Sequence, residues 1–159
     1  MTISIGDKLP AATLVKATAD GPDQVATGDF FAGRTVALFA VPGAYTPTCS
    51  AKHLPGFVEK LSEFRAKGVD EIACTAVNDA FVLDAWAKST DAHGVTMLAD
   101  GNGQFAAALG LSADSSKFGM GTRSRRYSML VDDGVVTQVH VEQPGEFKVS
   151  SADHLLANI

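Results

Sequence analysis

Apolar and polar positions fall along this chain in blocks typical of strands followed by helices. Val36–Val41 is an unbroken apolar run that stops at Pro42, which predicts a strand covered on both faces. From Pro55 the apolar residues recur three and four positions apart with charged residues between them, which predicts a helix with one buried face. Gly68 is expected to end that helix. The first regular elements are therefore a buried strand and a helix.

The same order repeats in the next part of the chain. Ile72–Val77 predicts a second buried strand. Asn78 or Asp79 is suited to cap a following helix, because both side chains accept hydrogen bonds from free backbone N–H groups. The buried face of this helix is expected to hold Phe81, Val82, Ala85 and Trp86. Val95–Ala99 then predicts a further short strand.

The pattern becomes more polar after the third strand. Gln104–Leu109 is rich in alanine and predicts a short helix that Gly110 closes. Residues 112–125 are polar and contain glycine, so we expect a loop. Arg126–Val131 and Val135–Val141 are β-rich runs joined by Asp-Asp-Gly, which is the strongest hairpin signal in the chain.

The two ends of the chain complete the expected fold. Residues 3–15 predict a small β-element laid over the domain, and residues 16–29 a surface loop. Ser150 and Asp153 resemble a capping box that opens a last helix. With no repeat or linker, residues 1–159 are expected to form a single domain. The order of elements predicts an α/β, thioredoxin-like fold, in which helices flank a central mixed sheet, with an N-terminal β-extension and a helical insertion.

Composition narrows the classes of partner and compartment. Hydrophobic residues make up 46 % and charged residues 19 % of the chain, and no apolar run approaches the ~18 residues that span a bilayer. We therefore expect a globular protein with no membrane partner. A net charge of −5 argues against binding nucleic acid, which requires clustered Lys and Arg. The N-terminus shows no targeting pattern, so a cytoplasmic location is expected.

The chain has two cysteines, Cys49 and Cys74. Two cysteines make no disulfide framework, and no Cys/His cluster has the spacing of metal ligands, so we expect no metal site. Cys49 follows the Pro/Gly turn after the first buried strand and falls at the predicted start of a helix. Free N–H groups and the positive end of the helix dipole favour a thiolate there. An inert structural thiol is the alternative reading.

The residues around Cys49 carry a specific resemblance. Pro42-x-x-x-Thr46-x-x-Cys49 matches the active-site motif of peroxiredoxins, and VPGAYTPTCSAKHLPGFVEK resembles their type II, or five-type, subfamily. The similarity extends to residues 71–86 and 118–136, so it covers nearly the whole chain. The family's catalytic arginine precedes an aromatic-Ser-Met sequence, which here makes it Arg126.

The resemblance implies a thiol-dependent peroxidase that needs no metal, haem or flavin. The Cys49 thiolate would attack one oxygen of hydrogen peroxide or an organic hydroperoxide, leaving a sulfenic acid and releasing water or an alcohol. Thr46 and Arg126 would hold the peroxide oxygens, and Pro42 would shield the pocket from water. A peroxide sensor that relays oxidation to a partner, and a disulfide oxidoreductase of the same fold, are the alternative functions.

The sequence leaves two routes for the resolving step, in which a second thiol reacts with the sulfenic acid. The C-terminal stretch in which some relatives carry a resolving cysteine has none here, whereas Cys74 matches a cysteine that some plant type II members use. Cys74 is either that resolving residue or a buried strand cysteine. In the second case the sulfenic acid would be reduced by glutathione with glutaredoxin, or by thioredoxin.

Other residues near the motif are expected to lie outside the reacting centre. His53 follows Cys49 by one turn and either tunes the thiolate or points into solvent, and we expect the second. Arg123 and Arg125 are expected on a solvated loop or at an interface. By resemblance, the region of Phe118 is expected to help build a homodimer face beside the site.

Overall fold

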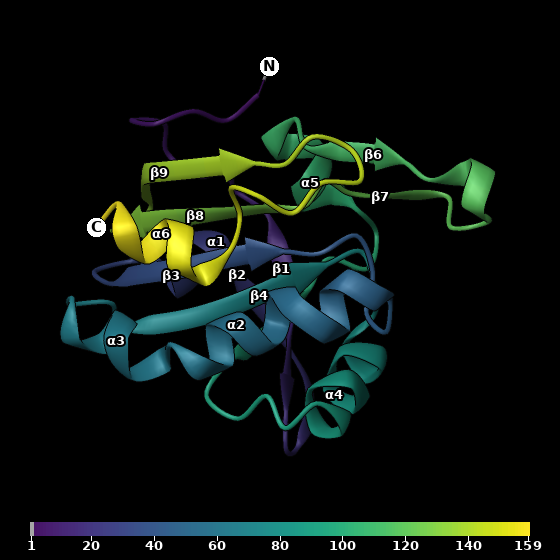
Figure 1. Ribbon diagram of the computed structural model, residues 1–159, viewed down its shortest axis with the longest axis horizontal. Helices are drawn as coiled ribbons and strands as arrows, with labels where there is room; N and C mark the ends of the chain where they lie inside the picture. The colour runs from purple at the N-terminus through teal and green to yellow at the C-terminus, as the bar shows by residue number, and fades with distance from the viewer. Residues whose placement is uncertain (1) are drawn as a thin grey trace.

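The computed structural model describes residues 2–159 and is built on a seven-stranded mixed sheet with helices on both faces (Figure 1). The strand order is β2-β1-β5-β4-β3-β8-β9, in which β3, β4 and β5 are parallel neighbours and the outer pairs are antiparallel. The strands are β1 (Thr13–Thr18), β2 (Gly21–Ala26), β3 (Thr35–Ala40), β4 (Glu71–Ala76), β5 (Thr96–Ala99), β8 (Tyr127–Asp132) and β9 (Val135–Val141). A separate pair, β6 (Ser112–Asp114) and β7 (Thr122–Ser124), projects from one corner as a hairpin (Figure 1).

The helices divide between the two faces of the sheet. They are α1 (Thr27–Phe30), a π-helical turn η1 (Cys49–His53), α2 (Leu54–Glu59), α3 (Leu61–Ala66), α4 (Ala80–Ser89), α5 (Gln104–Leu109), a 3₁₀ turn η2 (Ser116–Phe118) and α6 (Ala152–Ala157). Figure 1 shows α2, α3, α4 and α6 in front of the sheet and α1 and α5 behind it. Each face buries its own apolar cluster, and Cys49 and Cys74 both belong to the cluster under α2 and α4.

The fold class and most elements agree with the sequence. The expected strands and helices from Val36 to Gly110 are present, and the Asp132-Asp133-Gly134 hairpin joins β8 to β9. Asp79 caps α4, since its Oδ1 accepts a hydrogen bond from the N–H of Val82 at 2.9 Å. These elements were predictable because local turn chemistry and burial point to the same structure.

Two segments predicted as loops are β-hairpins. Residues 16–29 contain the end of β1, all of β2 and most of the short helix α1. Residues 112–125 contain β6, η2 and β7. Both predictions were wrong because β2, β6 and β7 are stabilised by cross-strand backbone hydrogen bonds while many of their side chains stay exposed, so their sequences show little apolar alternation.

Three finer predictions also need correction. Phe81 is 71 % exposed and Ala85 is also exposed, whereas Trp86 is buried as predicted, together with Ala80 and Leu83. Ser151, rather than Ser150, caps α6 by accepting a hydrogen bond from the N–H of His154. The helix after Pro55 is broken at Lys60 into α2 and α3.

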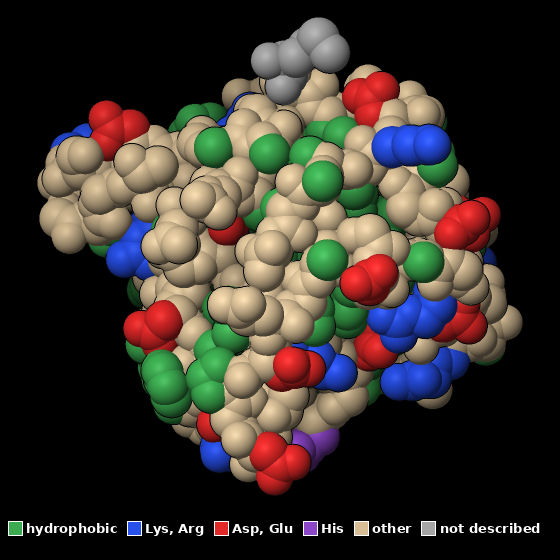
Figure 2. Space-filling view, turned by 180° about the vertical axis from the view of Figure 1, so that it is seen from behind, with side chains coloured by type: hydrophobic (Ala, Val, Ile, Leu, Met, Phe, Trp, Pro, Cys, Tyr) green, Lys and Arg blue, Asp and Glu red, His purple; other side chains and the backbone are tan. Residues whose placement is uncertain are grey.

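The surface carries mixed charge. From behind, Figure 2 shows acidic and basic side chains interspersed, mostly around the edges of this face. Within residues 2–159, no helix is long and apolar enough to cross a membrane.

Candidate active site

The loop between β3 and the following helix brings the motif residues together. Ala44 donates its N–H to Oδ1 of Asn78 at 3.0 Å, which ties the loop to the end of β4. Tyr45 has a φ of 67°, a left-handed conformation uncommon for a residue with a side chain, so the turn is tight. Gly43 is buried, and a Cβ there would lie 3.2 Å from the methyl group of Met120 and 3.4 Å from Cγ2 of Thr46. The close packing of this turn therefore favours glycine.

The cysteine lies in a widened helical turn. The helix begins at Pro47, and from Cys49 to His53 it is a π-helix, in which the carbonyl of Cys49 accepts from the N–H of Leu54. Pro55 has no N–H to donate to Ala51, and its ring would press on that carbonyl in a regular α-helix. The wider turn relieves this clash, and such π-turns often occur at functional sites.

The sulfur of Cys49 has two polar neighbours. Cys49 is 0 % exposed, and its Sγ lies 2.8 Å from Oγ1 of Thr46 and 3.1 Å from Nη2 of Arg126. The Thr46 hydroxyl is also 2.7 Å from the carbonyl oxygen of Gly43, so its single proton is shared between two acceptors. Arg126, which precedes β8, reaches the sulfur across the end of β3. Three of the predicted site residues thus meet at one atom.

His53 is buried, and the prediction that it points into solvent was wrong. It is 0 % exposed and packs against Phe39 at a ring-centroid distance of 5.0 Å. Its Nδ1 lies 2.9 Å from Nη1 of Arg126, and its Nε2 lies 2.9 Å from the carbonyl oxygen of Ser150. Burial and the nearby guanidinium lower the pKa of His53 to about 3, so it is neutral at ordinary pH. The spacing of residues along the sequence did not show that this turn is π-helical or that apolar side chains surround His53.

A buried carboxylate lies behind the histidine and was missed by the sequence reasoning. Glu142 follows β9 and is 3 % exposed, and one of its oxygens accepts the N–H groups of residues 148–150 and the hydroxyl of Ser150, all within 2.8 Å. Burial alone would raise the pKa of Glu142, but these donors together hold it below its ordinary value. In Figure 1 the segment that Glu142 secures crosses in front of β8 and β3 between β9 and α6.

Phe147 lies in that same segment and covers the pair formed by Arg126 and His53. Its ring centroid is 5.1 Å from that of His53, and the guanidinium carbon of Arg126 is 5.9 Å from it. An aromatic ring with polar neighbours in a Pro-Gly loop gives little signal in the sequence. The position of Phe147 over Arg126 and His53 was therefore not predictable from the sequence and is seen only in the folded structure.

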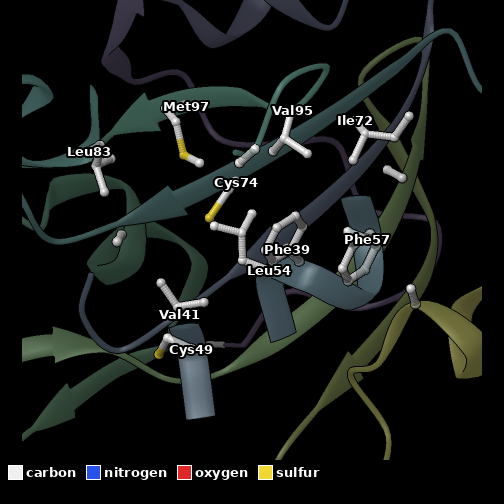
Figure 3. Close-up of a cluster of buried hydrophobic side chains, with 14 of the residues drawn as sticks. Phe39, Val41, Cys49, Leu54, Phe57, Ile72, Cys74, Leu83, Val95 and Met97 are labelled. Carbon is white, nitrogen blue, oxygen red and sulfur yellow. The ribbon is translucent and has the colours of Figure 1, made fainter. Parts of the chain in front are cut away.

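Cys74 lies on β4 in the apolar cluster. It is 0 % exposed, and burial first, with the nearby Cys49 second, raises the pKa of its thiol well above the ordinary value. Figure 3 shows Cys49 and Cys74 at separate places in this cluster, with Val41 and Leu54 among the side chains around them. Both thiols are free.

The remaining predicted residues have different surroundings. Pro42 follows β3 and is half-buried. Arg123 is held by the carbonyl oxygens of Met120 and Val77, and Arg125 donates to the carbonyl oxygen of Glu142, so both are structural rather than freely solvated. Among residues 2–159, no three or more His, Cys, Asp or Glu side chains gather where they could hold a metal ion.

Comparison with known proteins decides the family. Residues 4–156 match the Redoxin family. The chain is 54 % identical, over 98 % of its length and 72 % of the relative, to Peroxiredoxin-2E-2, chloroplastic, of Oryza sativa subsp. japonica. It is 49 % identical to Peroxiredoxin-2B of Arabidopsis thaliana, covering 97 % of this chain and 96 % of that protein. The chain belongs to the peroxiredoxin family.

Solved structures agree with this assignment. Reduced Prx3 of Vibrio vulnificus in complex with hydrogen peroxide superposes with a TM-score of 0.96 at 49 % identity, covering 99 % of both chains. The peroxiredoxin described here is therefore of type II and is a thiol-dependent peroxidase on a thioredoxin-like fold.

Proposed function

We propose that Cys49 is the peroxide-attacking thiol of this peroxidase. The observation that carries the proposal is the sulfur itself, contacted by a hydroxyl and a guanidinium in an otherwise apolar setting. In the reaction the thiolate sulfur forms a bond to one peroxide oxygen while the O–O bond breaks. Cys49 becomes a sulfenic acid, and the other oxygen leaves with the electron pair and takes up a proton to give water or an alcohol.

Thr46 and Arg126 have complementary parts in this proposal. Arginine stays protonated at neutral pH, so Arg126 contributes positive charge and geometry, favouring the thiolate and stabilising charge on the leaving oxygen. The Thr46 hydroxyl is able to rotate its proton between the sulfur and an incoming oxygen. Half-buried Pro42 lies at the entrance of the same loop, where its ring limits water.

Peroxide consumption with a thiol reductant tests the proposal. The variant Cys49→Ser has nearly the same shape but a much weaker nucleophile, so it is expected to lose measurable turnover and keep its fold. The matched control, Cys74→Ala, is expected to react with peroxide as the unchanged protein does. Normal turnover by Cys49→Ser would contradict the assignment of the nucleophile.

We further propose that an external thiol reduces the sulfenic acid, either glutathione with glutaredoxin or thioredoxin. Support comes from Cys74, which is fully buried in a strand and has a thiol that burial keeps protonated. A direct bond to Cys49 would need Cα atoms within ~7 Å and side chains that face each other. The folded arrangement in Figure 3 favours the external route.

The proposal includes a homodimer in the cytoplasm. Phe118 is 70 % exposed at the end of the η2 turn, and Tyr45 is 54 % exposed on the active-site loop, so the single chain leaves two aromatic side chains uncovered. Sedimentation equilibrium of the unchanged protein and of Phe118→Lys tests the dimer, which the charge should weaken. A monomer in both cases would contradict it, and cell fractionation tests the location.

A further inference from the structure

Besides the sulfur, Arg126 contacts the first of a series of hydrogen-bonded, buried polar groups. One guanidinium nitrogen, Nη2, faces the Cys49 sulfur at 3.1 Å, and the other, Nη1, faces Nδ1 of His53 at 2.9 Å. Both Arg126 nitrogens are donors, so His53 Nδ1 must be the acceptor in this contact. Arg126 is thus held at two points, only one of which is the reacting atom.

The hydrogen bond of Nε2, the second ring nitrogen of His53, explains why Nδ1 is able to accept. Nε2 lies 2.9 Å from the carbonyl oxygen of Ser150, which accepts only, so Nε2 carries the proton. Ser150 is in turn fixed by Glu142, which accepts both the Ser150 N–H and its hydroxyl at 2.8 and 2.7 Å. The tautomer of the histidine is therefore set by a buried carboxylate through one backbone carbonyl.

We propose that His53 is a positioning residue for the peroxidase reaction, whose neutral Nδ1 holds the Arg126 guanidinium against the Cys49 sulfur. Glu142 supports this by securing Ser150. A neutral acceptor orients the guanidinium without pairing off its positive charge, so the full charge remains available to the thiolate and to the leaving oxygen. The inference rests on the proposed roles of Cys49 and Arg126.

The surroundings keep the histidine in this state. His53 is enclosed by the rings of Phe39, Phe57 and Phe147, at centroid distances of 5.0, 5.7 and 5.1 Å. The charged groups that face it are Arg126 from the start of β8 and Glu142 from the end of β9. Its low pKa agrees with a ring that stays an acceptor throughout the working pH range.

Two substitutions at one position separate positioning from packing. His53→Gln offers a neutral amide with an acceptor and a donor, whereas His53→Phe fills the aromatic pocket and offers neither. His140→Phe is the matched control, because the His140 ring packs against His154 and hydrogen-bonds Gln138 rather than Arg126. All variants are made in the Cys74→Ala background, so that only one thiol titrates.

The readouts are the stopped-flow rate with hydrogen peroxide, the pH midpoint of thiolate formation by ultraviolet absorbance, and thermal unfolding. For His53→Phe we expect a rate about tenfold lower and a midpoint at higher pH than in the parent, because Arg126 loses its second anchor. His53→Gln and His140→Phe are expected to stay near the parent values. Glu142→Gln is expected to shift both readouts in the direction of His53→Phe but by less.

Two results would overturn the inference. In the first, a folded His53→Phe matches the parent in rate and midpoint. In the second, His53→Gln and His53→Phe fall equally, which would mean that the ring acts through its shape and not through Nδ1. Unchanged readouts in Glu142→Gln would contradict the supporting role of Glu142. An active Cys49→Ser would instead overturn the proposed function, so the two failures are distinguishable.

Discussion

The Thr46 hydroxyl proton is shared between two acceptors, and a single substitution at this residue tests what the hydroxyl does. Oγ1 is 2.7 Å from the Gly43 carbonyl oxygen and 2.8 Å from the Cys49 sulfur. The hydroxyl is therefore able to turn its hydrogen bond toward whichever atom carries the negative charge, first the sulfur and then the leaving oxygen. The backbone carbonyl holds the hydroxyl in place while it does so.

Replacing Thr46 tests this at the residue scale. Thr46→Val keeps the shape but has no hydroxyl, and a lost hydrogen bond to a charged group corresponds to about 10- to 100-fold in rate. Thr46→Ser restores the hydroxyl and is expected to recover most of the rate. Stopped-flow reaction with hydrogen peroxide is the measurement, and equal rates in the valine and serine variants would contradict the role.

At the scale of elements, the helix that carries Cys49 is tied to α4 by one hydrogen bond. The indole Nε1 of Trp86 donates to Oγ of Ser50 at 2.9 Å, and Trp86 is 0 % exposed and the only tryptophan in the chain. Any unwinding of residues 47–53 would break this bond and change the environment of the indole. Tryptophan fluorescence therefore reports whether the helix start stays folded during the redox cycle.

This reporter separates the two resolving routes. If an external thiol reduces Cys49, oxidation with one equivalent of peroxide should change Trp86 fluorescence equally in the unchanged protein and in Cys74→Ala, and both should turn over with glutathione and glutaredoxin or with thioredoxin. A bond between Cys49 and Cys74 needs the helix to unwind. A larger fluorescence change in the unchanged protein alone, with both thiols lost in non-reducing mass analysis, would contradict the external route.

For the whole molecule, burial of a neutral histidine makes stability depend on pH. Unfolded His53 has the ordinary pKa of 6.5, and folding lowers it to about 3. Between these values the unfolded chain binds a proton that the folded chain does not, so the free energy of unfolding falls as pH falls. Glu142, whose pKa is also lowered in the fold, adds a loss of the same sign at more acidic pH.

Denaturant unfolding at a series of pH values tests this. Below about pH 6, His53 is expected to remove about 1.4 kcal/mol of stability per pH unit. The variant His53→Gln cannot titrate, so its slope should be smaller by about that amount, while the half-buried His140 contributes equally to both proteins. Equal slopes in the two proteins would show that His53 is not neutral and buried in solution.

The sequence predicted the parts of the molecule in which local and global signals coincide. Val36–Val41, the Asp79 cap and the Asp-Asp-Gly turn each have a local cause that the fold retains. The motif placed Cys49, Thr46 and Arg126, which meet at one sulfur atom.

What the sequence missed depends on contacts between distant segments. Spacing along a regular helix did not show that Pro55 widens the turn or that His53 is turned inward. Glu142 reads as an ordinary charged residue until the loop of residues 148–150 folds over it. The hairpin β6–β7 was missed because its side chains are mostly polar and exposed.

The most direct test of the account is to locate the first oxidised atom. The protein is treated with one equivalent of hydrogen peroxide, trapped at once with a reagent specific for sulfenic acid, and mapped by peptide mass spectrometry. The trapped group is expected on Cys49, at full yield in Cys74→Ala and absent in Cys49→Ser. Trapping on Cys74, or an oxidised Cys49→Ser protein that still consumes peroxide, would contradict the central claim.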